Sequence, residues 1–311
     1  MMKRTRIAFA VAAVAAAVAT IGVAACGSGS NDPLASGGPA SKAGAGTIVV
    51  GSANFPENAL LAEIYAGALS AKGVKVEKKL NIGSRETYIP ALKDGSIDLI
   101  PEYTGVLDQY FNKNAKATTA DGVYAELKAA VPATLAILDK SGAEDKDSVV
   151  VTKETAAKLS LKSIGDLAPH AKSLTLGGPP EWKTRPTGVP GLKKVYNLEF
   201  KTFRPLDTGG PLSVQALKNG QVDAVNLFTT DPAIAANGFV ILDDPKSLFA
   251  AQNVVPLITK SKVNPTISAA LNAVSTKLDT ATLGGLVKEV VIDKKDAAVV
   301  AKEFLTKNAL G

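Results

Sequence analysis

The chain of 311 residues contains one short segment twice. "ALKDGSIDLIPEYT" at 91–104 aligns without gaps with "ALKNGQVDAVNLFT" at 216–229, and the Ala, Leu, Lys, Gly, Asp and Thr positions are identical. The copies lie 125 residues apart (216 minus 91). Stacked repeats have periods of about 20–50 residues, so this spacing instead indicates two lobes of similar architecture.

The elements predicted around each copy follow the same order. The first copy ends a succession of strand 47–52, helix 56–73, strand 74–83, helix 85–95 and strand 97–105. The second follows strand 173–178, helix 189–200 and strand 202–207. Such alternation predicts open α/β sheets with ligands at the carboxyl ends of the strands. Further helices are predicted at 121–141 and 265–310, the latter packing on the first lobe.

Two aromatic residues occupy equivalent strand ends in the copies, Tyr103 and Phe228. If the lobes face each other, these residues line opposite walls of one cleft, where they contact a ligand. The alternative is that both are packing residues at the rim.

The loops after the first strand of each lobe supply polar groups to the same cleft. "GSANFPEN" at 51–58 carries Asn54, Phe55, Glu57 and Asn58 beside a helix N-terminus, where free N–H groups favour anions. "GGPPEWKTRPTGVPG" at 177–191 carries Trp182, which is predicted to hold the loop in shape. It also carries Arg185, which is either a carboxylate clamp or a surface charge.

The N-terminus has the pattern of an export signal. "MMKRTR" precedes an uncharged run at 7–25, and "VAAC" at 23–26 resembles a bacterial lipobox. Residues 1–26 are therefore predicted to be a lipoprotein signal peptide ending at Cys26, the lipidated residue; the alternative is a retained anchor helix. Residues 27–46, rich in Gly, Ser, Ala and Pro, are predicted to be a flexible tether. Both alternatives place the rest of the chain outside the cytoplasm and tied to a membrane.

Composition argues against several classes of protein. One cysteine and one histidine leave no disulfide framework, no Cys or multi-His metal site and no well-placed nucleophile–histidine pair. The net charge of +6 includes Lys3, Arg4 and Arg6, and no long basic block remains for nucleic acid. No cofactor motif is present, and a non-enzyme is predicted; a small-molecule hydrolase is the less favoured alternative.

Six motifs together resemble a known family. They are "GSANFPEN", "GSRETYIPALKDGSIDLIPEYTG", "VTKETAAKL", "GGPPEWKTRPTGVPGLKKVY", "VDAVNLFTTDPAI" and "LFAAQNVVPLI", and they cover most of 48–258. The chain is similar to substrate-binding proteins of osmoprotectant (glycine betaine, choline) ABC importers, in the ProX/OsmF-like, OpuAC-type family.

The resemblance implies an α/β, two-lobed type II periplasmic-binding fold with a ligand cleft between the lobes. Lobe I would comprise 47–147 plus 250–311 and lobe II 148–249, with crossing strands near 145–150 and 248–255 as the hinge. Together with the N-terminal pattern, we expect an extracytoplasmic monomer, anchored as a lipoprotein to the outer face of the cell membrane. The resemblance implies delivery of the ligand to a membrane permease. The chain's partners would be a small-molecule ligand and the ABC permease and ATPase subunits.

In this family a quaternary ammonium sits in a cage of tyrosines, held by cation–π attraction. Tyr103 is retained, but Phe228 and Gln252 replace two tyrosines, and the position near Asp147 is not aromatic. We therefore expect weak betaine binding or a different, more polar ligand. The predicted ligand-binding residues are Asn54, Phe55, Glu57, Asn58, Tyr103, Thr104, Arg185, Phe228, Thr229, Thr230, Gln252 and Asn253.

Overall fold

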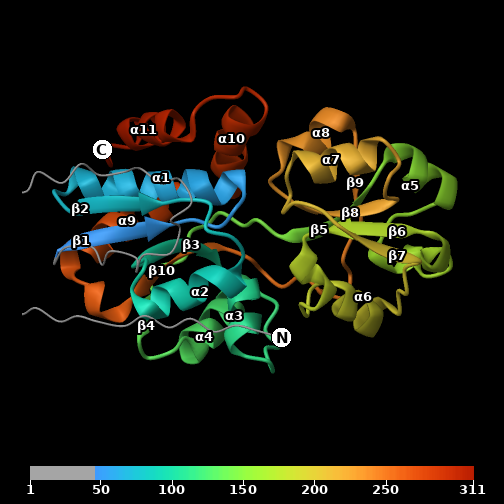
Figure 1. The fold of residues 1–311 in the computed structure, drawn as a ribbon, viewed down its shortest axis with the longest axis horizontal. Helices are drawn as coiled ribbons and strands as arrows, with labels where there is room; N and C mark the ends of the chain where they lie inside the picture. Colours follow the sequence, from blue (N-terminus) through green and yellow to red (C-terminus); the bar gives the residue numbers. More distant parts are fainter. Residues whose placement is uncertain (1–45) are drawn as a thin grey trace, which may run out of the picture. The chain divides into compact units, whose positions relative to one another are not determined.

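Two five-stranded sheets organise residues 46–311, the part of the chain that the computed structural model describes (Figure 1). The predicted signal peptide, Cys26 and all of the tether except Gly46 lie outside these residues. The described residues belong to one compact unit. Among them, no helix is both long enough and apolar enough to span a bilayer.

The first sheet has the strand order β2-β1-β3-β10-β4. β1 is parallel to β2 and β3, and β10 is antiparallel to β3 and β4. We call this sheet and the helices packed on it lobe I. Its strands are β1 (Thr47–Gly51), β2 (Lys75–Lys79), β3 (Leu99–Tyr103), β4 (Leu135–Ile137) and β10 (Val254–Thr259).

The strands of lobe I bury alternate residues on opposite faces, as the pleat requires. Ile48 and Val50 pack with α1 (Pro56–Ala71) and with α9 (Pro265–Lys277), α10 (Thr280–Val291) and α11 (Ala297–Lys307). Val49 and Ile100 pack on the other face, with α2 (Arg85–Asp94), α3 (Thr104–Phe111) and α4 (Ala120–Ala130). The C-terminal helices therefore do pack on the first lobe, as predicted.

The second sheet repeats this plan in the order β7-β6-β8-β5-β9. β6 is parallel to β7 and β8, and β5 is antiparallel to β8 and β9. We call this sheet and its helices lobe II. The strands are β5 (Asp147–Val151), β6 (Thr175–Gly178), β7 (Thr202–Pro205), β8 (Ala224–Phe228) and β9 (Val240–Ile241). The helices are α5 (Lys153–Leu159), α6 (Val189–Tyr196), α7 (Pro211–Lys218) and α8 (Pro232–Asn237), with short 3-10 turns at Ile164–Leu167, Ala171–Ser173 and Pro180–Lys183.

The repeated segment occupies the same place in each sheet. Gly95 after α2 and Gly220 after α7 both have a positive φ, of 79° and 65°, which glycine adopts most readily. The Asp98 carboxylate then accepts a hydrogen bond from Val49 N (2.9 Å), and the Asp223 carboxylate accepts one from Thr175 N (2.7 Å). Each aspartate thus joins the start of one strand to its parallel neighbour, and the predicted duplication is confirmed.

The predicted helix at 121–141 is wrong beyond Ala130. Pro132 lacks an N–H and disfavours helix before it, so α4 ends at Ala130 and the chain forms β4 instead. The strand predicted at 97–105 is shorter, Leu99–Tyr103, because α3 begins at the next residue, Thr104.

The chain passes between the sheets twice, and the two passages pair with each other. Asp145 N donates to Gln252 O (3.1 Å), and Val254 N donates to Ala143 O (3.0 Å), around an antiparallel bridge between Glu144 and Asn253. We call these passages, 138–146 and 242–253, the first and second crossing segments. They lie directly before β5 and β10, the antiparallel strands next to β8 and β3.

Candidate functional site

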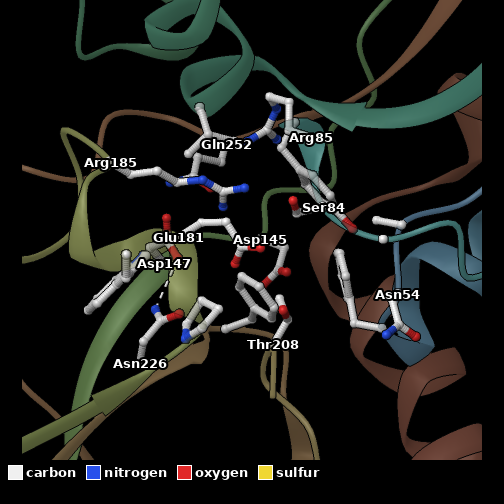
Figure 2. A pocket seen from close by; sticks show the side chains of 18 of the residues that line it. Asn54, Ser84, Arg85, Asp145, Asp147, Glu181, Arg185, Thr208, Asn226 and Gln252 are labelled. Atoms are coloured by element: carbon white, nitrogen blue, oxygen red, sulfur yellow. Dashed lines mark hydrogen bonds between the residues drawn. The ribbon is translucent and has the colours of Figure 1, made fainter. Parts of the chain in front are cut away.

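A cavity of about 60 Å³ lies where the carboxyl ends of β3 and β8 meet. Since one water molecule needs about 10–15 Å³, this cavity has room for about four to six waters. Both lobes contribute side chains (Figure 2). The lining residues are Ala53, Asn54, Phe55, Gly83, Ser84, Arg85, Tyr88, Tyr103, Val106, Asp145, Asp147, Pro179, Glu181, Trp182, Arg185, Thr208, Asn226, Phe228 and Gln252.

One wall of the cavity is aromatic. The Phe55 ring lies between the other two aromatics of this wall, 6.0 Å from the Tyr103 centroid and 5.0 Å from the Phe228 centroid. Phe55 precedes α1, whose first residue is Pro56, and its extended backbone directs the chain into the helix. The two repeated strand ends thus meet through a third aromatic from the β1–α1 loop, on one wall of the cavity and not on the opposite walls that the sequence predicted.

Both cavity arginines already have carboxylate partners. Arg85, at the start of α2, makes two 2.7 Å hydrogen bonds to Glu102, which also accepts one from Tyr88 Oη. Arg185 of lobe II makes two hydrogen bonds to Glu86 of lobe I, at 3.1 and 2.8 Å. Burial raises the pKa of Glu86, but the hydrogen bonds and charge of Arg185 outweigh it and bring that pKa down to about 2.

Three further carboxyl groups line the cavity: Asp145, Asp147 and Glu181. Burial, together with the nearby Glu57 charge, raises the pKa of Asp145 well above its usual range. Burial also raises the pKa of Asp147, although hydrogen bonding from Asn226 opposes the shift. Since Glu102 and Glu86 already neutralise the two arginines, the lining carries an excess of acidic groups. A cation bound beside these buried carboxyl groups would favour their charged form, so the cavity suits a ligand with positive charge.

Six of the twelve predicted ligand-binding residues line the cavity: Asn54, Phe55, Tyr103, Arg185, Phe228 and Gln252. Trp182, expected only to hold its loop, also lines it, while its buried ring stacks on Phe249.

The other six predicted residues lie around the cavity rather than in its lining. Glu57 is buried beneath it, where its carboxylate accepts hydrogen bonds from Tyr103 Oη (2.7 Å) and Thr230 Oγ1 (2.6 Å). Thr229 is exposed and accepts a hydrogen bond from Lys146 N. Contact between these six residues and a ligand stays a prediction.

The remaining three hold backbone segments in place. Asn58 accepts from Ala53 N and donates to Pro101 O. The Thr104 hydroxyl donates to Ala251 O and accepts from Asn253 N, while the Asn253 amide donates to Ser141 O. These bonds join the start of α3 to both crossing segments.

Sequence reasoning missed several lining residues, notably Ser84, Arg85, Asp145, Asp147, Thr208 and Asn226. Strand alternation offered a signal for one of them. Asn226 lies two residues before Phe228 in β8, so both side chains are on the same face. Within residues 46–311, no group of three or more His, Cys, Asp or Glu side chains is arranged to hold a metal ion.

Comparison with known proteins covers nearly all of the described chain. The chain is 26% identical over 266 residues to an ergothioneine transport permease/ergothioneine binding protein of Helicobacter pylori. That match covers 85% of this chain but 48% of the relative, so the chain spans about half the length of that protein. It is 27% identical over 281 residues to a carnitine transport binding protein of Listeria monocytogenes, covering 84% of this chain and 87% of the relative.

The fold has solved counterparts. A crystal structure described as a glycine betaine/carnitine/choline ABC transporter superposes with a TM-score of 0.67 at 26% identity, covering 85% of this chain and 99% of that one. The expected two-lobed type II periplasmic-binding fold is thereby confirmed. A family profile, the substrate-binding domain of ABC-type glycine betaine transport systems (OpuAC), matches residues 46–307. The chain belongs to this OpuAC family.

Proposed function

We propose that the chain is an extracytoplasmic binding protein that captures a small cationic or zwitterionic solute of the osmoprotectant kind. One observation carries this proposal: an aromatic wall and an excess of carboxyl groups share one cavity between the lobes. Aromatic faces attract a ligand cation by about 0.5–2 kcal/mol each. The relatives are named for carnitine and ergothioneine, both of which carry such a cation.

Capture would proceed by lobe closure. Three cross-lobe contacts support this step: the Arg185–Glu86 ion pair, the Thr230–Glu57 hydrogen bond and the packing of Phe55 on Phe228. We propose lobe boundaries at 147/148 and 249/250, with the paired crossing segments as the hinge. Only two chain passages would then need to adjust their backbone angles.

Delivery would be to an ABC permease with its ATPase subunits. We propose that the protein acts as a monomer held at the outer face of the cell membrane by lipid on Cys26. The sequence at 23–26 and the tether composition support the anchor.

A more polar ligand than glycine betaine is the second candidate. The observation that favours it is the placement of Asp147 and Gln252 in the lining, at positions where the family resemblance leads us to expect aromatic rings. Two lost cation–π contacts would weaken betaine binding by about 10- to 1,000-fold.

The test is calorimetric titration of the purified full chain with glycine betaine, choline, carnitine, ergothioneine and ectoine. The fluorescence of Trp182, the single tryptophan, gives a second signal from the cavity. We expect at least one cationic solute to bind and to change this fluorescence. Phe228→Ala should weaken that binding about 2- to 30-fold, whereas Phe239→Ala, at the edge of the lobe II core, should not. Failure of every cationic solute to bind would contradict the proposal.

A further inference from the structure

Three side chains of lobe II share one face of the second sheet at the cavity. Asp147 opens β5 and pairs directly with Phe228, the last residue of the antiparallel strand β8. Asn226 lies two residues earlier on β8 and so faces the same side. All three line the cavity. A cation that rests on the Phe228 ring would therefore share one face of the sheet with the Asp147 carboxylate and the Asn226 amide.

The Asn226 amide leaves one strong acceptor without a partner. Its Nδ2 donates to Asp147 Oδ1 (3.0 Å) and to Ser148 O (3.3 Å), both of which are acceptors, as Figure 2 shows for the first. This fixes the amide orientation and leaves Asn226 Oδ1 as the free end. The residue is 0% exposed, and Oδ1 has no hydrogen-bond partner within residues 46–311. Buried acceptors are seldom left unpaired in proteins, so a donor from the ligand is the natural partner.

The two arginines of the cavity do not supply a hydrogen-bond donor to Asn226 Oδ1. Arg85 is held by Glu102 and Arg185 by Glu86, each through two hydrogen bonds. Asp147, itself 7% exposed, receives hydrogen bonding from the amides of Asn226 and Gln252. The two acceptors beside Phe228 thus call for a positively charged group that also donates hydrogen bonds.

We propose that Asp147 and Asn226 form a subsite for an ammonium group that still carries N–H, and that it discriminates against full methylation. This rests on the proposed function, in which the cavity takes a small cation. A quaternary ammonium brings the same charge to the Phe228 ring but has no hydrogen to donate. It would leave Asn226 Oδ1 unpaired and hold its methyl groups against the carboxylate.

The experiment compares solutes that differ only by replacement of N–H with N–CH3. Calorimetric titration of the full chain would use N,N-dimethylglycine against glycine betaine, and proline against its N,N-dimethyl betaine. Within each pair the carboxylate and the net charge are the same. A hydrogen bond to a charged group supports a preference on the order of 10- to 100-fold for the N–H member.

Two variants test whether Asp147 and Asn226 cause the preference for the N–H member of each pair. Asp147→Asn removes the carboxylate charge. Asn226→Leu removes the unpaired acceptor, together with the amide donor to Asp147 and Ser148, while keeping the branching and the number of side-chain heavy atoms. In each we expect the affinity ratio within a pair to fall to about threefold or less. Asp121→Asn is the matched control, because its side chain is 96% exposed, and the ratio should not change.

Folding of each variant is checked by thermal melting, and the ratio is read from whichever variant folds. The wild-type comparison needs neither variant. If the fully methylated members bind as tightly as their N–H partners, the inference is overturned while the proposed function stands. An unchanged ratio in the folded variants would also overturn it. If none of the four solutes nor any cation of the wider titration binds, the proposed function itself fails.

Discussion

Thr230 of lobe II donates its hydroxyl hydrogen to the Glu57 carboxylate of lobe I over 2.6 Å. The backbone N of Thr230 also donates to Asp145 of the first crossing segment, at 3.0 Å. Tyr103 completes the cluster with a hydrogen bond to the other Glu57 oxygen. One buried network therefore connects the start of α1, the end of β3, the first crossing segment and lobe II.

Loss of the Thr230 hydroxyl should loosen this network. Thr230→Val keeps the side-chain shape but leaves a buried carboxyl oxygen without its cross-lobe donor. We expect the free energy of unfolding to fall by about 1–3 kcal/mol, measured by urea denaturation. Thr276→Val removes an exposed hydroxyl that donates to Ala273 O on α9, and should change it by less than about 0.5 kcal/mol. Equal effects of the two substitutions would contradict a cross-lobe role.

The same network predicts that stability falls as pH rises above about 4. Burial raises the pKa values of Glu57 and Asp145, and it raises the pKa of Asp231 to about 6. A carboxyl whose folded pKa is raised contributes stability below its unfolded value, near 4, and loses that contribution as pH rises through the folded value. Urea denaturation at pH 5, 6, 7 and 8 should therefore give a decreasing free energy of unfolding.

The pH dependence has a specific control. Asp145→Asn removes one raised carboxyl, so the decline between pH 5 and 8 should become shallower. Glu86, whose pKa is lowered to about 2, acts in the opposite sense but only as pH falls below about 4.5, outside this range. A slope that is unchanged in Asp145→Asn would contradict the assignment.

The repeat made much of the fold predictable from the sequence. Glycine at 95 and 220 and aspartate at 98 and 223 are local signals, because each acts within a few residues of a helix end or a strand start. The predicted helix 121–141 is wrong beyond Ala130, because Pro132 ends it. The strand that replaced it, β4, is defined by pairing with β10, more than 100 residues away in the sequence.

The site was harder to predict because its charges are balanced over long separations. Arg85 is neutralised by Glu102, and Arg185 by Glu86, through contacts between different elements. No local sequence pattern predicts such ion pairs. The sequence marks Asp147 only by the absence of an aromatic ring near it, and its place in the site depends on the register that sets it beside Phe228.

The aspartates of the repeat should be structural residues. Asp98→Ala removes a buried acceptor for Val49 N and should lower the free energy of unfolding by about 1.5–3 kcal/mol. Asp223→Ala removes the equivalent acceptor at a half-buried position and should cost about 1 kcal/mol. Solute affinity measured by calorimetry should stay the same in both. A loss of affinity without a loss of stability would instead place these aspartates in the binding site.

Substitutions at two glycines distinguish the effect of backbone strain from the effect of cavity shape. Gly209 and Gly220 have similar positive φ values, 60° and 65°, so alanine at either should cost about 1–2 kcal/mol of stability. A Cβ at Gly209 would lie 2.7 Å from the Phe228 ring, whereas one at Gly220 would have no atom within 4 Å. Gly209→Ala must therefore displace Phe228 or its own loop. We expect its affinity for the tightest-binding solute to fall about 2- to 30-fold by calorimetry, with Gly220→Ala unchanged. Equal affinities in the two variants would show that the position of the Phe228 ring does not matter for binding.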